Sequence, residues 1–229
     1  MNIVAIIPAR GGSKGIKNKN IVGVKGKPLI FHTLDIIKKI SQIDDFFVST
    51  DSKKIKKILE NKGIVVPFLR PKKFAKDNST DLDVMKHFYN WYKINYRKKI
   101  DLIIHLRPTT PLRKISTILK AIKIMKFFKN YDSLRSFVES DFPGYKLWLR
   151  NKNSAEVLVK SNKNYHSMGR QYMPKTFCHV GYIDILRPNK TILKNSMIGK
   201  KTYFFEINKK KEYFLDIDTK DDLKFTRNY

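Results

Sequence analysis

A basic, glycine-rich segment near the N-terminus has the composition of a phosphate-binding loop. It runs Pro8-Ala9-Arg10-Gly11-Gly12-Ser13-Lys14-Gly15, and Lys19 and Asn20 follow shortly after it. Adjacent glycines allow backbone N–H groups to turn toward one anion, and Arg10, Lys14 and Lys19 add charge for a polyphosphate. The spacing fits neither the dinucleotide-binding nor the Walker glycine pattern, which disfavours both classes. A flexible basic turn is the alternative interpretation.

Two aspartates near the C-terminus are candidates for binding a metal ion. In Leu215-Asp216-Ile217-Asp218-Thr219 the alternation puts Asp216 and Asp218 on one side of an extended segment. Neighbouring carboxylates repel each other unless a cation lies between them, and Mg²⁺ is commonly held by one or two carboxylates together with substrate phosphates. The pair therefore predicts a Mg²⁺ site, with helix capping by Asp218 as the alternative.

A third polar segment follows an apolar stretch in the middle of the chain. It reads Leu106-Arg107-Pro108-Thr109-Thr110-Pro111-Leu112-Arg113, and its two prolines restrict the backbone. We expect Thr109, Thr110 and Arg113 to face the same ligand as the first loop. A rigid strand-to-helix turn is the alternative.

Two weaker signals lie between these segments. Arg70-Pro71, followed by Asp77, Ser79 and Asp81, offers an arginine that could hydrogen-bond a base or a phosphate, and plain surface charge is the alternative. In Ser49-Thr50-Asp51 the aspartate comes directly after a predicted strand, where an N-cap for the next helix is the more common role.

The polar segments separate predicted strands and helices that alternate along the chain. Hydrophobic patterning predicts strands over residues 3–8, 45–49, 64–66, 101–106, 133–138, 181–186 and 203–207. It predicts helices over 28–40, 52–62, 80–96 and 115–128, and a final helix from about 219. This alternation predicts one α/β domain over residues 1–229, with a mostly parallel mixed sheet and helices on both faces. Ligands of such sheets bind beyond the carboxyl ends of the strands.

The alternation breaks between about residues 141 and 174. This stretch supplies large apolar groups without a helical period, among them Tyr145, Trp148, Tyr165 and Tyr172. We expect an inserted segment that covers a substrate or packs on a second subunit, with an ordinary aromatic-rich connection as the alternative.

The net charge of +28, from 48 basic and 20 acidic residues, suggests an anionic partner. A nucleic-acid-binding or membrane-binding protein would carry such a charge. However, most of the basic residues are lysines spread along the chain, rather than arginines and aromatics on one element. We therefore favour a general enrichment in lysine and expect no specific nucleic-acid partner and no membrane partner.

Three further features favour a cytoplasmic protein. The N-terminal apolar run stops at Pro8 and is too short for the core of a signal peptide. No stretch approaches the roughly 18 apolar residues of a membrane span. The single cysteine, Cys178, excludes an intrachain disulfide.

Taken together, the motifs resemble those of the acylneuraminate cytidylyltransferase (CMP-sialic-acid synthetase) family. The segments that carry the resemblance occur in the family's order: IIPARGGSKGIKNKN at the N-terminus, STD at 49–51, RP at 70–71, LRPTTPLR at 106–113, RQYMP at 170–174 and LDIDT at 215–219. The resemblance implies a Rossmann-like nucleotide-diphospho-sugar transferase fold and a homodimer with a small inserted dimerisation and lid segment.

The resemblance also implies site roles. CTP would lie over the first loop, and the nucleotide-binding residues would be Arg10, Gly11, Gly12, Ser13, Lys14, Lys19, Asn20, Arg70, Asp77 and Arg107. Arg70 would lie near the cytosine, and Asp216 and Asp218 would hold Mg²⁺. The catalytic set would be Arg10, Lys14, Lys19, Asp216 and Asp218, and the acidic sugar or the lid would meet Lys146, Arg170 and Gln171.

The implied reaction transfers CMP from CTP to the anomeric hydroxyl of a sialic-acid-like nonulosonic acid. The chain departs from the family in having Arg107 where glutamine is usual and Val180-Gly181 where Asn-Gly is common. Glutamine can accept a hydrogen bond and arginine cannot, so these positions bear on substrate recognition rather than on the reaction class. The alternatives are activation of an eight-carbon 3-deoxy sugar acid and, in a different class, nucleic-acid binding.

Overall fold

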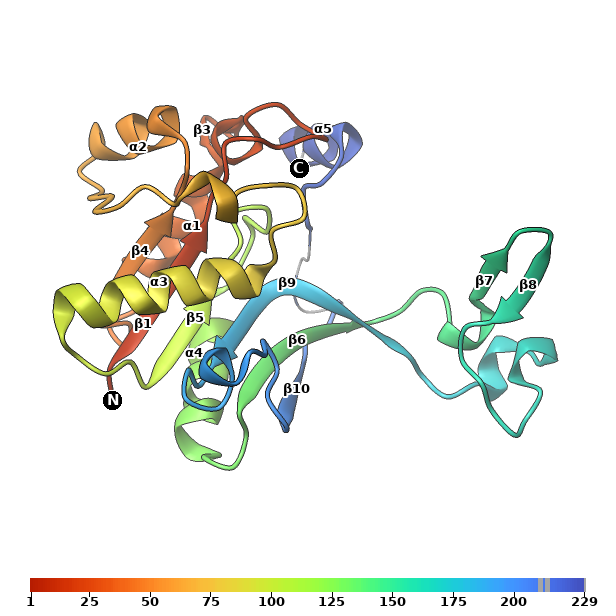
Figure 1. The fold of residues 1–229 in the computed structure, drawn as a ribbon. Coiled ribbons are helices and arrows are strands. Elements are labelled where there is room, and N and C mark those ends of the chain that lie inside the picture. The colour runs from red at the N-terminus through yellow and green to blue at the C-terminus, as the bar shows by residue number, and fades with distance from the viewer. Residues whose placement is uncertain (210–211, 213–214, 229) are drawn as a thin grey trace.

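The computed structural model describes residues 1–209, 212 and 215–228 and is built around a six-stranded sheet (Figure 1). The strand order is β10-β6-β9-β5-β1-β4. The strands are β1 (Ile3–Pro8), β4 (Asp45–Ser49), β5 (Leu102–His105), β6 (Ser133–Glu139), β9 (Phe177–Leu186) and β10 (Thr202–Glu206). Strand β9 pairs antiparallel with β5 and β6, and the other neighbours are parallel. The expected mostly parallel mixed sheet is confirmed.

Helices cover both faces of this sheet. They are α1 (Leu29–Ile37), α2 (Lys53–Glu60), α3 (Asp81–Tyr96) and α4 (Ile115–Phe127). The last helix, α5 (Lys220–Asn228), packs instead in a separate small core, where Leu223 lies with Val24 and Leu29. Alternate residues of β1 serve the two faces: Ile3, Ala5 and Ile7 belong to the core under α1, α2 and α4, whereas Val4 and Ile6 pack in the core under α3. This double burial explains why β1 is apolar at every position. None of the described helices is long and apolar enough to cross a membrane.

Shorter elements complete the chain. Two hairpins pair β2 (Gly23–Val24) with β3 (Lys27–Pro28) and β7 (Trp148–Asn151) with β8 (Ser154–Val157). Single helical turns are η1 (Lys19–Ile21), η2 (Lys72–Phe74), η3 (Gly144–Lys146), η4 (Tyr165–Ser167), η5 (Arg170–Tyr172) and η6 (Ile192–Lys194). Residues 140–176, between β6 and β9, form an arm that carries β7 and β8 and projects from the sheet (Figure 1).

The structure differs from the sequence expectations at two loops. Residues 64–66 form no strand, although Ile64 and Val66 are buried, because this segment has no strand partner among the described residues. The N-cap of α2 is Ser52, whose hydroxyl accepts the N–H of Ile55, rather than Asp51. The carboxylate of Asp51 instead accepts the backbone N–H of Gly11 at 2.9 Å.

Arg113 is a buried structural brace and does not face a ligand, so the expectation was wrong for this residue. It was also wrong for Thr110, whose buried hydroxyl donates to the carbonyl of Gly181 at 3.2 Å. Its guanidinium donates to the carbonyl oxygens of Arg107 and Gly181 at 2.8 Å each, to the carbonyls of Thr110 and Tyr182, and to the hydroxyl of Thr33 at 3.1 Å. Burial lowers the pKa of Arg113 to about 9. Because this value is still above neutral pH, the guanidinium remains charged. The brace ties the loop after β5 to β9 and α1.

Arg113→Leu should destabilise the protein strongly, because it leaves several buried carbonyl groups without a donor. A buried unpaired acceptor costs about 1–3 kcal/mol, so we expect a loss of roughly 3–5 kcal/mol in the free energy of unfolding. Denaturant titration measures this loss, and Arg97→Gln, a surface change at the end of α3, is the control and should stay within about 0.5 kcal/mol. Equal stability of the two variants would show that Arg113 is not a brace.

Candidate active site

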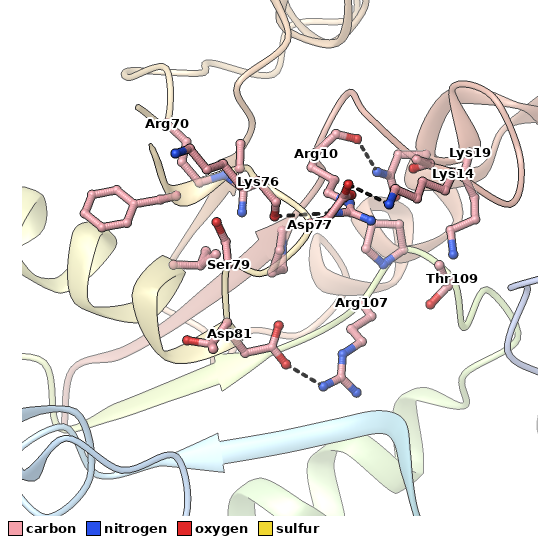
Figure 2. A pocket seen from close by; sticks show the side chains of 18 of the residues that line it. Arg10, Lys14, Lys19, Arg70, Lys76, Asp77, Ser79, Asp81, Arg107 and Thr109 are labelled. Carbon is pink, nitrogen blue, oxygen red and sulfur yellow. Dashed lines mark hydrogen bonds and ion pairs between the residues drawn. The ribbon is translucent and has the colours of Figure 1, made fainter. Parts of the chain in front are cut away.

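A cavity of about 590 Å³ opens where the loops after β1 and β5 meet the segment before α3 (Figure 2). The residues that line it include Arg10, Ser13, Lys14, Lys19, Asn20, Arg70, Asp77, Ser79, Asp81, His105, Arg107, Thr109, Asp216 and Asp218. The structure thus brings together polar residues that are more than 200 positions apart in the sequence. Gly11 and Gly12 belong to the same loop but do not line the cavity.

The loop after β1 is anchored to its surroundings. The side-chain amide of Asn20 donates to the carbonyl of Arg10 at 2.9 Å, and the N–H of Gly11 is held by Asp51. A Cβ atom at Gly11 would lie 2.8 Å from the Cβ of Ser52, so the close approach to α2 requires glycine. Because its N–H is already engaged, Gly11 shapes the loop and does not donate to an anion.

The cations of this loop are paired with a carboxylate across the cavity. Asp77 lies 2.8 Å from the ammonium of Lys14 and 3.3 Å from the guanidinium of Arg10 (Figure 2). The hydrogen bond from Lys14 is the main cause that lowers the pKa of Asp77. All three side chains are exposed enough to exchange partners, since Lys14 is 77% and Asp77 53% accessible. An entering polyphosphate would therefore compete with Asp77 for both cations.

Arg70 offers donors that no described residue uses. The residue is 5% exposed and lines the cavity, yet Nε and Nη2 have no hydrogen-bond partner. Its nearest carboxylate, on Asp51, is 4.0 Å away. Burial is the main cause that lowers the pKa of Arg70. Buried donors without partners are costly unless a ligand satisfies them, so Arg70 is a strong candidate for binding one.

Asp216 and Asp218 reach the cavity because Ile217 anchors the segment between them. The N–H of Ile217 donates to the carbonyl of Thr109 at 2.8 Å, and the side chain of Ile217 is fully buried. Asp218 does not cap α5. The cap is Thr219, whose hydroxyl accepts the N–H of Asp222 while the carboxylate of Asp222 accepts the N–H of Thr219. The capping alternative for Asp218 is therefore wrong.

The two carboxylates fit a divalent cation that also binds a phosphate. Oδ1 of Asp216 is buried without a hydrogen-bond partner, and Asp218 faces the ammonium of Lys19 at 2.6 Å. A positive group therefore already lies beside this pair. Among the described residues, no group of three or more His, Cys, Asp or Glu could hold a metal ion. Further ligands would have to come from substrate or water, as is usual for Mg²⁺.

A buried charge network that the sequence analysis missed lies beside Arg107. Asp184 of β9 is 2% exposed and contacts Nε2 of His179 at 2.9 Å, Nε of Arg135 at 3.4 Å and Nδ1 of His105 at 3.5 Å. Burial opposes ionisation, but the two histidines and Arg135 outweigh it and hold the pKa of Asp184 far below its usual value. The available signal was a charged residue inside the apolar run Tyr-Ile-Asp-Ile-Leu.

Three predicted substrate residues lie on the arm and do not line the cavity. Lys146 donates to the carbonyl of His166 at 2.6 Å, and the guanidinium of Arg170 stacks over Phe142 at 5.7 Å. Gln171 follows Arg170 in the same turn, beside Gly169. Figure 1 shows this arm well away from the loop that follows β1. Within one chain, the structure does not bring Lys146, Arg170 or Gln171 to the cavity.

The chain has an α/β fold with a cavity in which a cationic loop lies opposite two carboxylates, and comparison with known proteins specifies the family. A family model described as cytidylyltransferase matches residues 4–228. The chain therefore belongs to the cytidylyltransferase family.

Similar proteins agree with this family assignment. The chain is 34% identical to N-acylneuraminate cytidylyltransferase of Streptococcus agalactiae serotype III over 97% of its own length and 52% of that protein. It is 28% identical to pseudaminic acid cytidylyltransferase of Campylobacter jejuni serotype O:2, over 99% of this chain and 95% of that one. The chain thus spans about half the length of the streptococcal relative.

A solved structure confirms the fold. The structure of CMP:2-keto-3-deoxy-manno-octonic acid synthetase complexed with CTP matches with a TM-score of 0.70. The match covers 100% of this chain and 98% of that chain at 16% sequence identity, so it bears on the fold alone. The expected Rossmann-like nucleotidyltransferase fold is therefore confirmed.

Proposed function

We propose that this protein transfers CMP from CTP to the anomeric hydroxyl of a sialic-acid-like nonulosonic acid and releases pyrophosphate. The observation that carries the proposal is the pairing, in one cavity, of a cationic loop with the carboxylates of Asp216 and Asp218. Relatives named for CMP transfer to N-acylneuraminate and pseudaminic acid support the same chemistry. We also infer that the protein works in the cytoplasm.

The residues act by binding and by neutralising charge. Arg10, Ser13, Lys14 and Lys19 would hold the triphosphate over the loop, and the unpaired donors of Arg70 would meet the cytosine. The bond from the sugar oxygen to the α-phosphorus forms as the bond to the pyrophosphate oxygen breaks, and the hydroxyl proton is released. Fixed cations around the triphosphate stabilise the charge that develops on the oxygens.

Asp216 and Asp218 would hold Mg²⁺ in this scheme. The unpartnered Oδ1 of Asp216 and the exchangeable contact of Asp218 with Lys19 support that assignment. Bound Mg²⁺ would neutralise phosphate charge and help to orient the triphosphate.

Pyrophosphate release with a panel of sugars tests the function. The panel contains CTP and Mg²⁺ with sialic, legionaminic and pseudaminic acids, an eight-carbon 3-deoxy acid, mannose and glucosamine. We expect release with at least one nine-carbon acid and none with the neutral sugars. Release with the eight-carbon acid alone would establish the alternative substrate, and turnover of a neutral sugar would exclude the proposed substrate class.

Arg10→Ala and Lys14→Ala should each lower turnover by about 10²-fold or more, because each removes a charge contact with the triphosphate. Folding should be unchanged, since both side chains lie on an exposed loop. Lys17→Ala is a matched control in the same loop, because Lys17 is exposed and does not line the cavity. Steady-state kinetics at saturating sugar measure the effect. Near-normal rates in both variants would remove this loop from the active site.

Asp216→Asn and Asp218→Asn should each raise the Mg²⁺ concentration needed for half-maximal rate, and at least one should be nearly inactive. The change is isosteric and removes only the negative charge that a hard cation needs. Asp221→Asn, at a 93% exposed position three residues further on, is the control. Full activity of both cavity variants at low Mg²⁺ would place the metal elsewhere.

We also propose a homodimer in which the arm of one chain reaches the cavity of its partner. The arm exposes large apolar side chains, with Phe142 65%, Trp148 52% and Tyr172 71% accessible. Exposed apolar groups on one small projecting element are typical of an interface. In such a dimer Lys146, Arg170 and Gln171 would contact the sugar bound by the other chain.

Complementation tests this arrangement. Lys146→Ala and Asp216→Asn chains should each be impaired alone, but co-expressed chains should form mixed dimers in which one cavity has neither defect. Random pairing then restores about a quarter of the wild-type sites. If Lys146 acts in its own chain, every cavity keeps a defect and co-expression restores nothing.

A further inference from the structure

The cavity contains a further cation, Arg107, that is separate from the cationic loop. Figure 2 shows Arg107 beside Asp81 and pointing toward β9, away from Lys14 and Lys19. Its side chain is 27% exposed and lines the cavity. Arg107 comes from the loop after β5, and the other candidate cations come from the loop after β1 and from Arg70.

Two carboxylates hold one edge of this guanidinium. Nη2 donates to Oδ2 of Asp81 at 2.7 Å and lies 3.9 Å from Oδ2 of Asp184. Asp81 is the first residue of α3, and a capping box between Thr80 and Asp83 fixes that helix start. Burial alone would lower the pKa of Arg107, but Asp81 and Asp184 outweigh it and raise the pKa. Arg107 is therefore charged and restrained on its Nη2 side.

The other edge of the guanidinium lies close to β9 at Gly181. A Cβ atom at Gly181 would be 3.0 Å from Nη1 of Arg107, 3.2 Å from its Cδ and 3.4 Å from Oδ2 of Asp216. A side chain at this position would therefore push the guanidinium away from the strand by a few tenths of an ångström. Among the described residues, Nη1 and Nε have no hydrogen-bond partner. Arg107 thus presents free donors beside the proposed metal ligand Asp216.

The strand register fixes Asp184 beneath Arg107. Arg135 of β6, Asp184 of β9 and His105 of β5 are directly paired across the sheet. Together with His179 they give the buried carboxylate cationic or hydrogen-bonding neighbours on several sides. Asp184 therefore cannot swing away, and the contact with Arg107 has a fixed position.

We propose that Arg107 binds the carboxylate of the acidic sugar, with Asp81, Asp184 and Gly181 as positioning residues; this rests on the proposed function. In a 2-keto acid sugar the carboxylate and the reacting hydroxyl are on the same carbon. The carboxylate must therefore lie next to the α-phosphorus, which in the proposed reaction would lie near the metal ligand Asp216. Arg107 is the cation whose free donors are there, and a guanidinium edge matches a carboxylate.

The test compares the effect of Arg107 variants on KM for the sugar acid with their effect on KM for CTP. Arg107→Gln should raise KM for the sugar acid about 10- to 100-fold, the worth of one charge-assisted hydrogen bond, and should change KM for CTP less than about threefold. Arg107→Lys keeps the charge but loses the planar guanidinium. Its KM for the sugar acid should therefore lie between those of wild type and Arg107→Gln. Arg97→Gln, the same change at the far end of α3, should alter neither constant.

Two further comparisons exclude a purely structural effect. Gly181→Ala keeps every charge but displaces Nη1, so KM for the sugar should rise while the melting temperature stays near that of wild type. Replacing the sugar carboxylate by its amide should raise KM strongly for wild type and much less for Arg107→Gln. Equal preference for acid over amide in the two proteins would overturn the assignment.

Other outcomes are equally decisive. A rise in KM for CTP alone would place Arg107 at the nucleotide, as its family position suggests. A fall in kcat with both KM values unchanged would place it at the α-phosphate. If calorimetry and pyrophosphate release show that wild type neither binds nor uses any sugar acid, then the proposed function itself fails. Wild-type turnover with an unaltered Arg107→Gln variant would refute only this inference.

Discussion

The geometry of the cavity depends on the hydrogen bonds of Arg113. Its Nη2 group donates at 2.8 Å to the carbonyls of both Arg107 and Gly181, so one nitrogen sets the spacing between the loop after β5 and strand β9. Because Arg113 holds the backbones of Arg107 and Gly181 together, the guanidinium of Arg107 lies against Gly181. The same loop also anchors Ile217 through the carbonyl of Thr109, which carries Asp216 and Asp218 to the cavity. A buried, charged residue that does not line the cavity thus positions groups that do.

Much of the fold and of the cavity could be predicted from local patterns. The apolar run of β1 is continuous because α1 and α3 bury opposite sides of it, and Gly11 is required by the approach to Ser52. Polar residues that follow parallel strands meet at one edge of the sheet whatever the details of packing. For that reason Arg10, Lys14 and Thr109, which follow predicted strands, could be placed at the cavity from sequence position. Asp216 and Asp218 were identified from the alternation of their carboxylates, and Arg107 from the family resemblance.

The features that were missed all depend on contacts between distant segments. Whether Arg113 faces a ligand or the core depends on β9, which is about 70 residues away and runs antiparallel to β5. The contact of Asp184 with His105 and Arg135 requires the register of three strands, and shifting a strand by one residue would move its side chain to the other face. The arm could be recognised because the alternation of strands and helices breaks there, but no local pattern indicated that it projects away from the cavity.

The distribution of carboxylates argues against treating this cavity as a general basic surface. Four of the chain's 20 acidic residues line it, namely Asp77, Asp81, Asp216 and Asp218. A nucleic-acid-binding face would lose affinity for phosphates with each of them, whereas a triphosphate site that also holds a cation needs both signs of charge. Lys14 pairs with Asp77 and Lys19 with Asp218. In the proposed reaction, phosphates that bind the two lysines would free Asp218 for the metal ion. The ion pairs within the protein would thus hold both binding groups in place until the substrate replaces them.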